Sequence, residues 1–169
     1  MSTTDADSAP LQTPIESRGE FLAALHDAVD RAVTRGARRM VWVDADFAEW
    51  PLEDAALLQR LTDWLRLPQR QLVLLAADYG DMRRRRARFV AWYRQWSHAI
   101  NAFGPSSDDV AELPCVLWAE RAALVFLLDP LRWRGWAVSD ALAQRQWRDR
   151  IDAILQRSEP AFPATTLGL

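Results

Sequence analysis

The fold is decided by the run Met-Val-Trp-Val-Asp at residues 40–44. This run is too short for a helix and rich in β-branched residues, which is typical of a strand buried on both faces. A second apolar run, Leu-Val-Leu-Leu-Ala-Ala at residues 72–77, has the same character. Between them, Pro51 is followed by Glu53 and Asp54, a pattern that predicts the first turn of a helix. The order strand, helix, strand indicates an α/β fold.

Further elements are predicted on both sides of this unit. Ser17 and Glu20 have the spacing of a capping box, and Gly36 follows a helical pattern of apolar residues. Glu120 and Arg121 separate two apolar runs, which indicates a hairpin. The predicted helices cover residues 17–36, 51–65, 81–100 and 139–156, and the hairpin strands cover residues 113–119 and 123–128. We therefore expect an α/β domain with a mixed, mostly parallel sheet, flanking helices and a C-terminal hairpin.

Composition divides the chain into three parts. Residues 1–15 are polar without apolar periodicity, and we expect them to be a disordered leader. Residues 16–157 hold all the predicted elements and have the length of a single α/β domain. Residues 158–169 carry prolines and spaced apolar residues, which favours an extended C-terminal tail. Such a tail either packs on its own domain as a strap or is recognised by another protein.

The basic and sulfur-containing residues exclude several kinds of chemistry. All 21 basic residues are arginines, so the chain has no lysine for a Schiff base or a P-loop. Cys115 is the only cysteine, and with only His26 and His98 beside it the chain cannot complete a four-ligand zinc site. We expect no cofactor. A lone cysteine and the absence of an apolar run of about 18 residues predict a cytoplasmic protein without a membrane span.

Three aspartates follow the two buried runs and form the first candidate site. Asp44 and Asp46 come at the end of the first run, and Asp78 follows the second. Ligands of open α/β sheets bind at the carboxyl ends of the strands, and grouped carboxylates can hold magnesium there. The alternative is that these aspartates form turns and cap helices.

Five arginines near the start of the helix predicted at residues 81–100 form the second candidate site. They are Arg83, Arg84, Arg85, Arg86 and Arg88. The amino-terminal end of a helix is already electropositive, so an anion such as a phosphate or a nucleic-acid backbone would stabilise this arrangement. The alternative is a solvated helix face, in which Arg85 pairs with Asp81 four residues earlier.

Alternating arginines and tryptophans follow the predicted hairpin and form the third candidate site. Arg132, Trp133 and Arg134 lie in a stretch that we expect to be a loop. These side chains could bind a ligand or contact a second subunit. Alternatively, arginine and tryptophan stack on each other within the chain.

The predicted order of elements resembles one half of a phospholipase D-like domain. In that superfamily a His-x-Lys-x4-Asp motif begins the strand that enters the hairpin. In this chain Leu113 occupies the position of the histidine, Cys115 that of the lysine and Glu120 that of the aspartate. The resemblance therefore implies the architecture and no catalysis, and because such halves pair, it implies a homodimer. Residues 17–157 are also similar to a bacterial domain of unknown function related to one fused to GNAT-type acetyltransferases.

These observations leave two main hypotheses for function. The first is a non-catalytic binding or interaction module, in which the arginines and the loop at residues 132–136 hold a phosphate-containing ligand or a nucleic acid. The second is a metal-dependent phosphotransfer or hydrolytic enzyme that uses Asp44, Asp46 and Asp78. A net charge of −2 gives no overall attraction to nucleic acid, so a basic site would have to be local. We favour the binding module.

Overall fold

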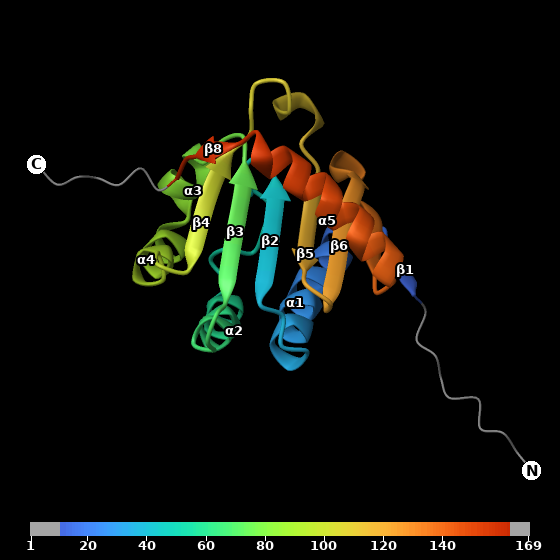
Figure 1. Cartoon of the computed structure of the whole chain (residues 1–169), viewed down its shortest axis with the longest axis horizontal. Helices are drawn as coiled ribbons and strands as arrows, with labels where there is room; N and C mark the ends of the chain where they lie inside the picture. The colour runs from blue at the N-terminus through green and yellow to red at the C-terminus, as the bar shows by residue number, and fades with distance from the viewer. Residues whose placement is uncertain (1–10, 163–169) are drawn as a thin grey trace, which may run out of the picture.

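The structure is a computed structural model that describes residues 11–162 and contains an eight-stranded sheet (Figure 1). The order of strands across the sheet is β1-β7-β6-β5-β2-β3-β4-β8. The strands are β1 (Gln12–Ile15), β2 (Arg39–Asp44), β3 (Gln71–Ala76), β4 (Ile100–Gly104), β5 (Cys115–Ala119), β6 (Ala123–Asp129), β7 (Arg134–Val138) and β8 (Glu159–Pro160). The two outer strands, β1 and β8, each contain a proline, Pro14 and Pro160.

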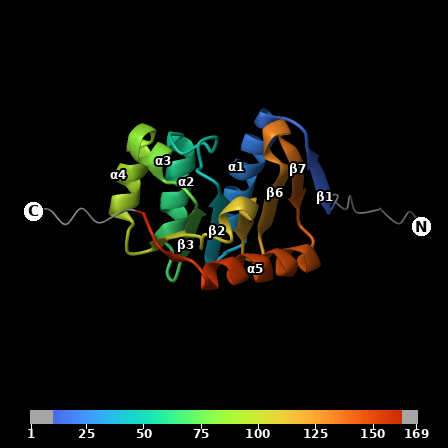
Figure 2. The same ribbon diagram turned by 90° about the horizontal axis from the view of Figure 1, so that it is seen from above.

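Helices cover both faces of the sheet. The five α-helices are α1 (Arg18–Thr34), α2 (Ala55–Leu65), α3 (Gly80–Arg85), α4 (Ala87–Gln95) and α5 (Ala141–Gln156), and two 3-10 turns are η1 (Val110–Glu112) and η2 (Pro130–Arg132). Figure 2 shows α1 to α4 on one face and α5 alone on the other. Within residues 11–162, no helix is long and apolar enough to cross a membrane.

The pairing of the strands confirms an α/β fold with a mixed sheet and a β5–β6 hairpin. Parallel pairing joins β2 to β3 and β3 to β4. All other neighbouring strands in the described part of the chain pair in antiparallel fashion, so the expected mostly parallel sheet is wrong. The reason is the connections: parallel strands need crossover helices, whereas β5, β6 and β7 follow one another through short turns.

The strand β2 connects the two halves of the core. Met40 and Trp42 point into the cluster under α1 to α4, and Val41 and Val43 point into the cluster under α5. All four side chains are buried, as predicted for a strand that is covered on both faces. The Nε1–H of Trp64 in α2 donates to the carbonyl of Ala37 at 2.7 Å, which ties the helix layer to the start of β2.

The single helix expected at residues 81–100 is wrong. Arg86, with φ −115° and ψ 52°, separates α3 from α4, and the helix ends at Gln95. Ile100 begins β4 and pairs in parallel with Leu72 of β3. The expectation failed because Phe89, Tyr93, Trp96 and Ile100 keep a helical spacing across a boundary that only sheet pairing determines.

Two further segments pair as strands against expectation. Residues 12–15 of the expected leader form β1, whose Ile15 is buried, and the rest of the leader, residues 1–10, lies outside the described residues. The expected loop after the hairpin contains β7 from Arg134 onward. In β7 a Cβ atom on Gly135 would lie 1.9 Å from the carbonyl oxygen of Phe126, so only glycine fits beside β6 at this bulge.

The starts of α1 and α2 follow local capping rules. The Ser17 hydroxyl accepts from the N–H of Glu20 at 3.2 Å, as the capping-box spacing predicts. The helix expected from Pro51 begins instead at Ala55, where the Asp54 carboxylate caps it by accepting from Ala56 at 2.8 Å and from Leu57 at 3.3 Å. The chain between Pro51 and Asp54 is a turn rather than a first helical turn.

The described end of the C-terminal tail packs on its own domain as a strap. Pro160 pairs with Phe103 of β4, and Ala161 donates to the carbonyl of Ala102 at 3.0 Å. The buried ring of Phe162 stacks on Tyr79, with ring centroids 5.2 Å apart and planes inclined by 11°. Residues 163–169 of the tail lie outside the described residues.

Replacement of Phe162 by alanine tests the strap. Removing a buried phenylalanine side chain leaves a cavity against Tyr79 and Tyr93, and we expect Phe162→Ala to lower the free energy of unfolding by about 3 kcal/mol. Urea denaturation measures this loss. The control is Leu131→Ala, since Leu131 is 92% exposed and its removal should change stability by less than about 0.5 kcal/mol. Equal effects of the two variants would contradict a packed strap.

Candidate functional site

The three candidate aspartates serve as turn formers. Asp44 Oδ2 accepts from the N–H of Phe47 at 2.8 Å and from that of Asp46 at 3.3 Å. Asp46 Oδ1 accepts from Ala48 at 2.9 Å, and Asp78 Oδ1 accepts from Gly80 at 2.7 Å. Each carboxylate therefore satisfies main-chain donors two or three residues further along, which is the alternative that the sequence left open.

The same aspartates do not assemble a metal site. Residues 11–162 contain no group of three or more histidine, cysteine, aspartate or glutamate side chains placed to hold a metal ion. Asp44 instead meets the buried thiol of Cys115 at the start of β5, and burial raises the pKa of Asp44 above its ordinary value. Burial and the Asp44 charge also raise the pKa of the Cys115 thiol well above its ordinary value, so this thiol is not a reactive thiolate.

Most of the arginines at residues 83–88 bind acidic or carbonyl groups of the same domain. Arg85 and Arg86 both lie 3.6 Å from Asp81, and Arg86 also donates to the carbonyl of Ala48. Arg88 donates to the carbonyl of Glu53 at 3.0 Å, and the Glu53 carboxylate accepts from the N–H of Arg88 at 3.1 Å. These contacts hold α3 and α4 on the loop before α2.

The other two arginines of this group differ from each other. The Arg83 guanidinium lies over the Phe162 ring, 5.1 Å from its centroid, and so forms part of the strap contact. Arg84 is exposed. The five side chains therefore do not converge on one anion site, because four of them already have partners within the domain.

The arginines and tryptophan at residues 132–134 are also held within the domain. Arg132 pairs with Asp129 at 2.9 Å, and Arg134 pairs with Glu16 at 3.5 Å. Trp133, in a left-handed conformation with φ 56°, packs its ring 5.7 Å from that of Phe21. This group follows β6, whereas the first arginine group follows β3, and two strands separate β6 from β3 in the sheet.

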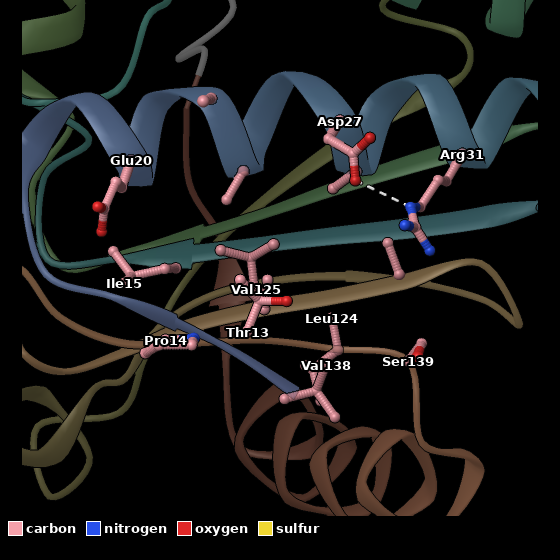
Figure 3. A pocket seen from close by; sticks show the side chains of 15 residues that line it. Thr13, Pro14, Ile15, Glu20, Asp27, Arg31, Leu124, Val125, Val138 and Ser139 are labelled. Carbon is pink, nitrogen blue, oxygen red and sulfur yellow. Dashed lines mark hydrogen bonds and ion pairs between the residues drawn. The ribbon is translucent and has the colours of Figure 1, made fainter. Parts of the chain in front are cut away.

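A groove on the surface lies beside α1. It lies between α1 and strands β1, β6 and β7, and measures about 400 Å³ (Figure 3). Its charged groups have local partners: Glu20 accepts from the N–H of Glu16 at 2.7 Å, and Asp27 pairs with Arg31 at 2.8 Å. The rest of its wall is mainly small and apolar. Its charged groups are therefore engaged locally, and the hydroxyl groups of Thr13 and Ser139 are the other polar side-chain groups in its wall.

The second hollow, which we call the arginine pocket, lies at the opposite edge of the sheet from the aspartates. It measures about 430 Å³ and lies where the end of α1, the β5–β6 turn and the start of α5 meet at the lower edge of Figure 1. Its four arginines are Arg35, Arg121, Arg145 and Arg148. They come from three separate elements, so the fold rather than the sequence brings them together.

The charges of the arginine pocket are poorly balanced. In the described part of the chain, no carboxylate lies within ion-pair distance of Arg35, Arg121 or Arg145, and Arg148 pairs only with its exposed neighbour Asp149 at 3.0 Å. Glu120 is the one acid that lines the pocket. Three guanidinium groups without an ion pair, against the one carboxylate of Glu120, favour an anion. The amino-terminal end of α5 beside them is capped by the Asp140 carboxylate.

The floor of the arginine pocket is fixed by buried groups. The Trp118 ring is 5% exposed, and its Nε1–H donates to the main-chain carbonyl of Gln144 at 3.1 Å. The sequence does not reveal this site because its arginines come from three segments that lie far apart along the chain. The only local signal was the spacing of Arg145 and Arg148, which places both on one face of a helix start.

Comparisons with known proteins support the fold. No family model and no curated protein matches the chain. The structure is similar to that of TrmBL2, an archaeal chromatin protein whose structure shows a novel mode of DNA binding, with a TM-score of 0.64 and 9% sequence identity. The likeness covers 94% of this chain and 56% of that chain, so this chain spans little more than half of TrmBL2. At this identity the likeness shows the fold alone.

Replacement of Asp44 by asparagine tests the buried carboxyl group. Because burial raises the folded-state pKa of Asp44 above the ordinary value of 3.8, the folded state holds this proton more tightly than the unfolded state. Its contribution to stability is therefore present at low pH and is lost as the pH rises through the folded-state pKa. We expect Asp44→Asn to remove this loss, seen as a shallower decline of the free energy of unfolding with rising pH.

The matched control for this variant is Asp108→Asn, at an exposed position. Guanidinium denaturation between pH 4 and pH 8 gives the slope for each protein. An Asp44→Asn slope identical to that of the unsubstituted protein would show that burial does not hold the proton on Asp44.

Proposed function

We propose that this chain is a non-catalytic binding module that holds a phosphate group in the arginine pocket. The observation that carries the proposal is the convergence of Arg35, Arg121, Arg145 and Arg148 on one hollow with a single acid, Glu120. Guanidinium groups bind phosphate oxygens in bidentate fashion, and they keep their charge at any physiological pH. A non-catalytic binding module is also the function class expected from the sequence. The proposed site is the arginine pocket, in place of the arginines at residues 83–88 and 132–134.

The residues at the phospholipase D-like motif positions favour binding over turnover. We propose that the chain is an inactive half-domain of the phospholipase D-like type, in which the motif positions hold Leu113, Cys115 and Glu120. Cys115 is buried at the start of β5, and its thiol is held neutral by burial and by Asp44. A buried neutral thiol cannot attack a phosphoester.

The bound phosphate could belong to a soluble ester or to a nucleic-acid backbone. The second source has one supporting observation, the similarity to TrmBL2, a chromatin protein that binds DNA. Both sources present the same phosphate oxygens to the arginines. They differ in salt dependence, because a nucleic acid releases several counterions on binding and a small ester does not.

The proposal is tested by replacing Arg145, which is exposed and can be truncated without disturbing the core. We expect pyrophosphate to raise the melting temperature of the unsubstituted protein at low salt and to raise that of Arg145→Ala much less. At a ligand concentration of 100 times Kd, the stabilisation should approach about 2.7 kcal/mol. Differential scanning fluorimetry measures the shift.

Arg94→Ala is the matched control, since it removes the same charge from an exposed position in α4. It should keep the full response to pyrophosphate. Equal responses of Arg145→Ala and Arg94→Ala would place anion binding outside the arginine pocket, and no response in any of the three proteins would overturn the proposal. Binding of a short DNA duplex with a steep salt dependence, lost in Arg145→Ala, would identify a nucleic-acid backbone as the source of the phosphate.

A further inference from the structure

The side chain of Gln144 lines the arginine pocket. Gln144 is 9% exposed and is the one buried polar or charged residue within residues 11–162. Its main-chain carbonyl accepts from Trp118, but none of the hydrogen bonds within these residues involves its side-chain amide. The amide atoms still reach solvent in the pocket. An amide both donates and accepts hydrogen bonds, so Gln144 can bind a ligand group that does the same.

The acid of the pocket also lacks an ion pair. Glu120 is half-buried at the start of the β5–β6 turn, and no ion pair of the described residues includes it, although four arginines line the same hollow. A carboxylate repels phosphate and accepts hydrogen bonds from hydroxyl or amino groups. Its presence therefore favours a ligand that carries such donors in addition to an anionic group.

The shape of the site favours a small molecule over a polymer. A hollow of about 430 Å³ has the size of a small-molecule site, and its floor is formed by the buried, apolar Trp118 and Ala122. A nucleic-acid backbone needs a track of cations along the surface. The other arginine group, residues 83–88, follows the carboxyl end of β3, at the opposite edge of the sheet, and most of its members already have partners.

We infer that the arginine pocket binds a small phosphate monoester whose body carries hydroxyl or amino groups. In this arrangement the guanidinium groups hold the phosphate, and Glu120 and the Gln144 amide bind the hydroxyl or amino groups of the body. The inference rests on the proposed function and adds the class of ligand to it. Glu120 and Gln144 thereby determine specificity, whereas the arginines supply most of the affinity.

The test compares two ligands that share the phosphate and differ in the body. Isothermal titration calorimetry at constant ionic strength measures the affinity of the full chain for ribose 5-phosphate and for inorganic phosphate. We expect ribose 5-phosphate to bind at least about tenfold more tightly, because hydrogen bonds to the Glu120 carboxylate and the Gln144 amide add to the phosphate contacts. Glu120→Gln should reduce this ratio severalfold without weakening the binding of inorganic phosphate.

The controls separate failure of this inference from failure of the proposed function. Glu112→Gln removes an exposed acid elsewhere and should leave the ratio unchanged. Equal affinities of the two ligands, with phosphate binding lost in Arg145→Ala, would overturn the ligand class and leave the anion site standing. An unchanged ratio in Glu120→Gln would likewise overturn the role of Glu120. If neither ligand binds, or if Arg145→Ala binds both normally, the arginine pocket is not the anion site and both proposals fail.

Discussion

β2 hydrogen-bonds to a parallel strand on one side and to an antiparallel strand on the other. This arrangement organises the whole molecule. β3 pairs with β2 in parallel and β5 pairs with β2 in antiparallel fashion. Its alternate side chains, Met40 and Trp42 against Val41 and Val43, enter the two separate core clusters. The free energy gained by burying these residues depends on both layers. Neither the parallel half of the sheet, β2 to β4, nor the antiparallel half, β5 to β7, can therefore form its core alone.

The parts of the fold that sequence reasoning predicted are those with strong local signals. Buried apolar runs predicted β2 and β3, and the Ser17 cap predicted the start of α1. The missed strands lack such signals. β1 reads Gln-Thr-Pro-Ile, β7 contains Arg134 and Gly135, and β8 has two residues, so only pairing with a neighbour makes them strands. Tertiary pairing is not visible to a local pattern.

The candidate sites show the same limit for electrostatics. A run of arginines such as residues 83–86 stands out in the sequence, yet its charges are partly taken up by Asp81 and by the strap at Phe162. The arginine pocket depends on Arg35 and Arg121, which no spacing rule connects to α5. A cluster of like charges in sequence predicts a charged segment, whereas a binding site requires charges that remain uncompensated after folding.

The two outer strands bear on how copies of this chain can associate. Each carries a proline, Pro14 in β1 and Pro160 in β8, and a proline has no N–H to donate to an incoming strand. Addition of a further strand, whether from a second copy or from an aggregating chain, would therefore lack a donor at both rims of the sheet. The homodimer expected from the sequence is therefore disfavoured from forming by strand addition at these rims, and so is growth of the sheet into fibrils.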